Sequence, residues 1–156
     1  MQKITTFLTY NNQAEEAAKF YVSIFKNSRI NKVVRFGAGA PAPEGSVMTV
    51  TFELEGQTFV ALNGGPHFKF AEGVSLYVDC QVQEEVDTLW IKLSEGGEPG
   101  VCGWLKDKFG LSWQIIPGIL IQMLADPDPK KSKRVMEAML QMKKIIIKDL
   151  QRAYQG

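Results

Sequence analysis

Hydrophobic and polar residues along the chain change their periodicity in an order that occurs twice. The first segment is rich in β-branched and aromatic residues, which favour a strand. Apolar residues then recur at helical spacing, and alternating segments follow, the last two joined by a turn at Glu55-Gly56. We predict a strand at 4–10, a helix at 14–25, and strands at 30–36, 48–54 and 58–62.

The same order returns after residue 73. A shift of 69 positions places Glu15-Glu16 on Glu84-Glu85 and Phe20-Tyr21 on Leu89-Trp90, which indicates a diverged internal repeat. Pro117 ends the last apolar segment of this second copy. We predict a strand at 74–78, a helix at 84–93, and strands at 101–106 and 111–116.

Each half therefore has a strand, a helix and further antiparallel strands, which predicts an α+β fold of two tandem βαβββ modules, residues 1–63 and 73–117. Neither half can close a core alone, because one face of a short sheet with a single helix stays uncovered. We expect the two modules to form one domain over residues 1–117. Their pairing, within a chain or between chains, would leave a cleft lined by the sheet faces away from the helices.

Residues 118–156 form an addition to the repeat that we predict to be a helical extension. Asp128-Pro129 is typical of a helix cap with proline at the first helical position, and an apolar stripe from Val135 to Met142 follows. Residues 145–147 suggest a short extended piece before a final helical turn. We expect the extension to pack on its own domain or on a partner subunit, with its methionines adapting to either surface.

Composition and charge remove several classes of function. Of the 156 residues, 45% are hydrophobic and 22% charged, which excludes intrinsic disorder. The formal net charge of +1 gives no electrostatic reason to expect nucleic acid or a membrane as a partner. Residues 126–156 nevertheless carry eight basic and four acidic side chains, so an interaction module built on this basic, Met-rich tail is one alternative function.

Histidine and cysteine limit the chemistry. His67 is the one histidine, and Cys80 and Cys102 have no spacing typical of a zinc site or a disulfide framework. The N-terminus lacks the pattern of a secretory signal, so we expect a cytoplasmic protein with reduced thiols. His67 and Cys102 are the candidate catalytic residues, although a general base needs an orienting partner and a reactive thiolate a cationic neighbour.

Other motifs are absent or incomplete. Gly37 to Ala42 lacks the third glycine of a dinucleotide-binding turn, and no Walker sequence or nucleophile elbow occurs. Trp104, Phe109, Trp113 and Gln114 form the densest aromatic cluster, which suits either a ligand or a core. Strand alternation predicts Gln114 toward the cleft and Trp113 toward the helices.

One segment carries a family resemblance. Residues 102–117, Cys-Gly-Trp-Leu-Lys-Asp-Lys-Phe-Gly-Leu-Ser-Trp-Gln-Ile-Ile-Pro, together with the loop at 63–68 and the tandem modules, resemble the PhnB-like, demethylubiquinone methyltransferase-like branch of one superfamily. This is the glyoxalase/bleomycin-resistance/dioxygenase, or vicinal oxygen chelate, superfamily. The resemblance covers about residues 3–117. It implies paired βαβββ modules and a homodimer.

In metal-dependent members of that superfamily, four strands each supply a His or Glu ligand. The corresponding positions here fall near Thr6, Ala61, Gly73 or Ser75, and Gln114, and none carries imidazole or carboxylate. We therefore expect no metal and no cofactor. The methyltransferase label finds no recognisable cofactor motif, since no glycine-rich turn follows a first parallel strand.

The resulting prediction is a homodimer that binds a small molecule in a metal-free cleft. An alternative is a metal-independent enzyme, or a methyltransferase-like activity as the family label suggests, acting through His67 or Cys102. The predicted ligand-binding residues are Thr6, Asn63, Ser75, Trp104 and Gln114.

Overall fold

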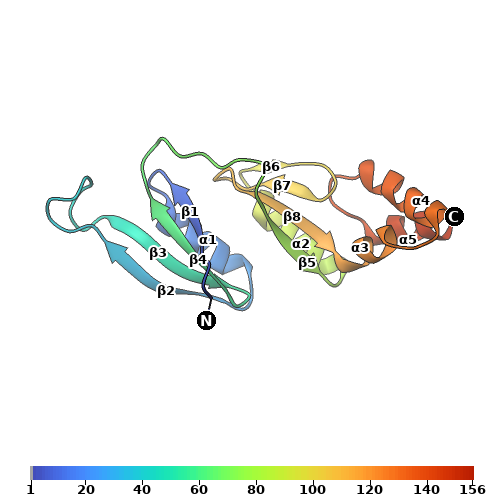
Figure 1. Cartoon of the computed structure of the whole chain (residues 1–156), viewed down its shortest axis with the longest axis horizontal. Helices are drawn as coiled ribbons and strands as arrows, with labels where there is room; N and C mark the ends of the chain where they lie inside the picture. The colour runs from blue at the N-terminus through green and yellow to red at the C-terminus, as the bar shows by residue number, and fades with distance from the viewer. Residues whose placement is uncertain (1) are drawn as a thin grey trace. The chain divides into compact units, whose positions relative to one another are not determined.

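The computed structural model describes residues 2–156 and contains two compact units, divided between Lys69 and Phe70. Each unit has one mixed four-stranded sheet with a helix against one face (Figure 1). The chain therefore has the predicted α+β fold of two βαβββ modules followed by a helical extension.

In the first unit the strand order is β1-β4-β3-β2, with β1 parallel to β4 and the other neighbours antiparallel. The core lies between this sheet and the helix, where Tyr21, Phe52 and Phe59 are buried. The hydroxyl groups of Tyr10 and Tyr21 are 3.1 Å apart, which satisfies both inside the core. The elements are β1 (Thr6–Tyr10), α1 (Ala14–Ile24), β2 (Ser28–Arg35), β3 (Val47–Leu54) and β4 (Gln57–Asn63).

The second unit repeats this topology with the order β5-β8-β7-β6, again with the first pair parallel. Trp90 and Leu93 of its helix are buried with Leu105, Trp113 and Ile115 of the sheet. The module comprises β5 (Ser75–Cys80), α2 (Gln83–Ser94), β6 (Glu98–Pro99), β7 (Trp104–Lys106) and β8 (Ser112–Pro117).

The predicted strand at 101–106 is wrong in its first half. Cys102 and Gly103 both have left-handed backbone conformations, with φ of 56° and 83°, which no strand residue adopts. The Trp104 N–H donates to the Val101 carbonyl, 3.0 Å away, and closes a turn. Strand β7 therefore begins only at Trp104.

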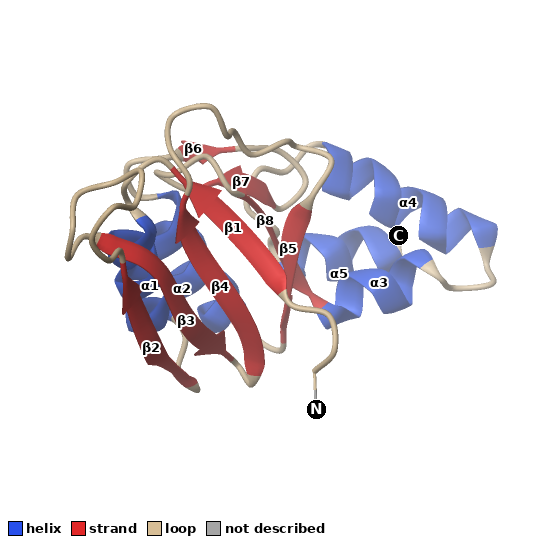
Figure 2. Cartoon of the chain, turned by 60° about the vertical axis from the view of Figure 1, so that its left-hand side comes forward, coloured by secondary structure: helices blue, strands red, loops and turns tan. Residues whose placement is uncertain are grey.

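The extension consists of α3 (Gly118–Leu124), α4 (Pro129–Leu140) and α5 (Ile147–Gln155), which lie side by side (Figure 2). The predicted cap at Asp128 is confirmed, since its Oδ1 accepts the Lys130 N–H at 2.9 Å. The extended segment predicted at 145–147 ends one residue earlier in the structure, because α5 starts at Ile147. None of the helices in residues 2–156 has the length and apolar character needed to cross a membrane.

The extension packs on its own unit through an apolar cluster. Ile116 at the end of β8 is the point where this cluster meets the sheet, and Ile145 is fully buried beside it. A β-carbon built on Gly103 would lie 2.6 Å from Ile116 Cδ1 and 3.1 Å from Ile145 Cγ1. The buried members of the cluster are Ile116, Leu120, Met123, Val135, Ile145 and Leu150.

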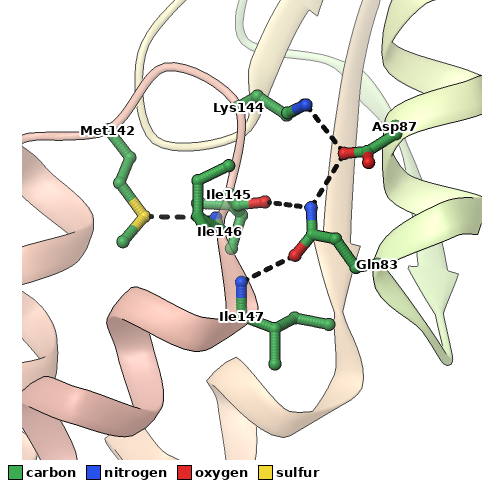
Figure 3. Close-up of polar contacts among 7 residues, drawn as sticks. All are labelled: Gln83, Asp87, Met142, Lys144, Ile145, Ile146 and Ile147. Carbon is green, nitrogen blue, oxygen red and sulfur yellow. Dashed lines mark hydrogen bonds and ion pairs between the residues drawn. The ribbon is translucent and has the colours of Figure 1, made fainter.

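Backbone contacts add to this packing. The Gln83 side chain donates to the Ile145 carbonyl at 3.0 Å and accepts the Ile147 N–H at 2.7 Å (Figure 3). An ion pair of 2.7 Å joins Lys144 to Asp87 on the same helix α2. The extension is thus fixed to α2 and to the turn before β7.

Replacing Gly103 with alanine tests this packing. Gly103→Ala and Gly110→Ala both place a β-carbon on a left-handed residue, at φ 83° and 89°, which costs about 1 kcal/mol. Only Gly103 has close neighbours, and overpacking there adds about 1–3 kcal/mol. Urea denaturation should therefore show a larger loss in the free energy of unfolding for Gly103→Ala. Equal losses would contradict the packing described here.

Candidate functional site

The candidate site is the open face of the second sheet, the face away from α2. Leu105 and Trp113 are paired across β7 and β8, and both are buried, 1% and 2% exposed. Because side chains alternate along a strand, Trp104 and Gln114 lie on the opposite face. Trp113 thus packs toward the helix and Gln114 away from it, as the alternation predicts.

Three side chains form a row across this open face. Gln114 of β8 is the register partner of Tyr77 on β5 and of Trp104 on β7. Partners on adjacent strands share a face, and their β-carbons are about 5 Å apart. Tyr77 is 47% and Trp104 37% exposed, so two aromatic side chains border one amide on a surface that solvent reaches. We call these three residues the aromatic row.

Ser75 orients the amide in this row. Gln114 Nε2 donates to Ser75 Oγ at 2.9 Å, which fixes the side chain's direction. Among residues 2–156 we find no donor to Gln114 Oε1, so this carbonyl oxygen can accept a hydrogen bond from a ligand. The row therefore combines aromatic surface with one directed acceptor.

The two ends of the open face differ. At one end Lys106 forms an exposed ion pair with Glu72, and each partner keeps the other charged: the hydrogen bond lowers the pKa of Glu72 and raises the pKa of Lys106. At the other end Ile116, two residues after Gln114, is 4% exposed because the extension covers it. Burial raises the pKa of the Tyr77 phenol, and the negative charge of Asp79 raises it further. The phenol therefore stays neutral.

Asp107 explains why the Trp-x-x-Asp-x-Phe-Gly-x-x-Trp-Gln segment has its spacing. Its buried carboxylate accepts the N–H groups of Phe109 and Leu111 at 2.9 and 3.1 Å, and the Trp113 indole N–H at 2.9 Å. These bonds hold the turn between β7 and β8 and orient Trp113 into the core. The motif thus contains Trp104 and Gln114 of the aromatic row, and Asp107 positions them without belonging to the row.

The structure brings together three of the five predicted binding residues: Ser75, Trp104 and Gln114. Tyr77 belongs with them and was missed, although alternation from Ser75 places it on the same face. Thr6 lies on the face that packs against α1, together with Leu8, and the open face of β1 presents Phe7 instead. A role for Thr6 in ligand binding stays a prediction.

The Asn63 side chain has a structural role. Its Oδ1 accepts the Ala14 N–H at 2.9 Å and its Nδ2 donates to the Val47 carbonyl at 3.0 Å. Asn63 therefore supplies the cap that α1 lacks in its own sequence, where Gln13 makes no side-chain bond. Its predicted contact with a ligand stays untested.

The two candidate catalytic residues lie in different units. His67 is exposed on the loop after β4, and no hydrogen bond or ion pair to a described residue is found for it. Cys102 is half-buried and its N–H donates to the Met142 carbonyl at 2.8 Å. Burial raises the pKa of the other thiol, Cys80, to about 12, so Cys80 stays protonated. A catalytic role for His67 or Cys102 stays a prediction.

The residues do not fit the divalent metal that the superfamily implies. Ala61 is fully buried, Ser75 and Gln114 bond to each other, and none of the four corresponding positions has imidazole or carboxylate. Within residues 2–156, His, Cys, Asp and Glu nowhere form a group of three or more that could hold a metal ion.

Comparisons with known proteins agree with this fold. Residues 2–116 match the model of a family described as 3-demethylubiquinone-9 3-methyltransferase. A structure described as a putative 3-demethylubiquinone-9 3-methyltransferase, PhnB protein, from Bacillus cereus is 42% identical, with a TM-score of 0.66, over 72% of this chain and 97% of that chain. Protein PA1353 from Pseudomonas aeruginosa is 20% identical, with a TM-score of 0.60, over 72% of this chain and 95% of that chain.

A comparison with curated proteins gave no match. The family model nevertheless covers both modules, and the identity to the Bacillus cereus protein extends over nearly its whole chain. This chain therefore belongs to the 3-demethylubiquinone-9 3-methyltransferase family, the PhnB-like family that its sequence resembles.

Proposed function

We propose that the chain binds a small planar molecule against the open face of the second sheet. The observation that carries this proposal is the aromatic row, in which Tyr77 and Trp104 border Gln114. Large aromatic side chains that stay exposed beside a directed polar group are typical of ligand-binding surfaces. The family's shared fold supports a small-molecule role without naming the ligand.

Each residue of the row has a distinct part in such binding. Trp104 and Tyr77 offer ring surface to a flat ligand, and stacked or edge-to-face contacts add to the area that is buried. Gln114 Oε1 accepts an N–H or O–H group of the ligand, while Ser75 keeps the amide from turning. A planar ring that carries a hydrogen-bond donor fits this combination.

We also propose that binding needs no metal and that the protein works as a homodimer in the cytoplasm. Neutral amide and hydroxyl groups at the candidate positions support the first point. Exposed Phe7 on the open face of the first sheet supports association with a second copy, and two free cysteines support a reducing compartment. Catalysis through His67 or Cys102, and partner binding by the basic tail, stay predictions.

Removing the Trp104 ring tests the binding surface. N-phenyl-1-naphthylamine, a neutral amine with a planar naphthyl ring and one N–H donor, whose fluorescence rises on binding, should bind the wild-type protein. Trp104→Ala should raise its Kd about tenfold, because a large aromatic contact is lost. Phe68→Ala removes an aromatic ring that is 58% exposed in the other unit and should leave the Kd unchanged. Equal Kd values for the wild type and Trp104→Ala would refute the proposed site.

Metal analysis tests the second part of the proposal. Purified protein, prepared without nickel or added divalent ions, should contain far less than one divalent metal per chain by mass spectrometry. Probe binding should survive treatment with a chelator, since the row offers no imidazole or carboxylate ligand. Stoichiometric metal, or binding lost on chelation, would contradict metal-free binding.

A further inference from the structure

The helical extension lies outside the part of the chain that defines the family. The family match ends at residue 116, and the Bacillus cereus relative is already matched over 97% of its length. The remaining 3% of that chain is too short for a counterpart of residues 118–156. The family model therefore does not include the extension or its contacts with the second sheet.

The row depends on a turn with an unfavourable backbone. Cys102 has φ of 56°, a left-handed conformation that residues with a β-carbon rarely adopt. Gly103, also left-handed, follows, and Trp104 comes next as the first residue of β7. The register with β8 decides the face on which Trp104 lies, and these two residues place the start of the strand that carries it. Such a conformation persists only where surrounding contacts hold it.

The extension supplies those contacts. The N–H groups of Cys102 and Gly103 donate to the carbonyls of Met142 and Lys143, both at 2.8 Å. On the other side, the Gly103 carbonyl accepts the Ile115 N–H at 2.8 Å. The turn is thus held between strand β8 and residues 142–147, which we call the connector because they join α4 to α5.

Helix α2 holds the connector in place. Figure 3 shows the Gln83 amide between the connector's backbone groups, donating to the Ile145 carbonyl and accepting the Ile147 N–H. Gln83 also donates to Asp87, which pairs with Lys144. One amide side chain therefore satisfies two backbone groups where α5 begins, a few residues from the carbonyls that bind the turn.

We infer that Gln83 is a positioning residue for the ligand-binding surface: it fixes the connector, the connector fixes the Cys102-Gly103 turn, and the turn sets the position of Trp104. The inference rests on the proposed function for its effect on ligand affinity. The link from Gln83 to the position of Trp104 is independent of any ligand. The experiment below measures the position of Trp104 and the affinity for a ligand separately.

The test uses the full chain labelled with 5-fluorotryptophan and observed by fluorine NMR. The chain has three tryptophans, and Trp104→Phe assigns one resonance. Gln83→Ala should shift or broaden the Trp104 resonance and leave those of Trp90 and Trp113 in place, since the latter two are held in the core. The Kd for N-phenyl-1-naphthylamine should rise about threefold, as expected for the loss of one or two hydrogen bonds.

Three further variants separate positioning from general destabilisation. Cys102→Gly in the Gln83→Ala background should restore both the Trp104 resonance and the Kd, because glycine adopts the left-handed conformation without cost. Gln81→Ala changes an exposed neighbour that bonds to Glu85 through its backbone N–H, so it is the matched control and should change neither readout. Lys144→Met, a milder change that breaks only the ion pair, should give a smaller shift in the same direction and serves if Gln83→Ala does not fold.

The outcomes distinguish the two proposals. An unchanged Trp104 resonance in folded Gln83→Ala and Lys144→Met, or equal changes at all three tryptophans, would overturn the positioning role. Absence of probe binding in the wild type would overturn the proposed function, while the fluorine spectra would still decide the link between Gln83 and Trp104.

Discussion

The buried carboxylate of Asp107 is the constraint on which the candidate site depends. It accepts three hydrogen bonds, two from the backbone of the turn after β7 and one from the Trp113 indole. A one-residue slip between β7 and β8 would move every side chain to the other face, so the register decides which residues meet solvent. With Trp113 held inward by Asp107, Gln114 and its partners must face outward.

The extension adds a second level of constraint. Residues 126–156 are basic, but the ion pair of Lys144 with Asp87 is partly exposed and contributes little by itself. The apolar cluster around Ile116 and Ile145 is the main source of its attachment. Gln83 and the Cys102-Gly103 turn then make this attachment specific, since backbone groups are satisfied at fixed places.

Much of this could be predicted from the sequence, because the strand, helix and strand periodicities occur twice and fix the fold. The sheet face on which Thr6 lies could not be predicted, because three residues separate β1 from α1 but two separate β5 from α2. The shift of 69 positions aligns α1 with α2, but β1 and β5 need a shift of 70. An error of one residue moves a strand's side chains to the opposite face of the sheet. Helix α3 and the turn at Cys102 depend on packing between distant segments, which local pattern does not contain.

The proposed function requires that the open face of the second sheet, and no other part of the aromatic cluster, receives a ligand. Proton–nitrogen NMR of labelled protein during titration with N-phenyl-1-naphthylamine tests it directly. We expect the Trp104 indole N–H and the Gln114 side-chain amide signals to move together, while the Trp113 indole N–H, bonded to Asp107, stays in place. Movement of the Trp113 signal with Trp104 and Gln114 unchanged would contradict it.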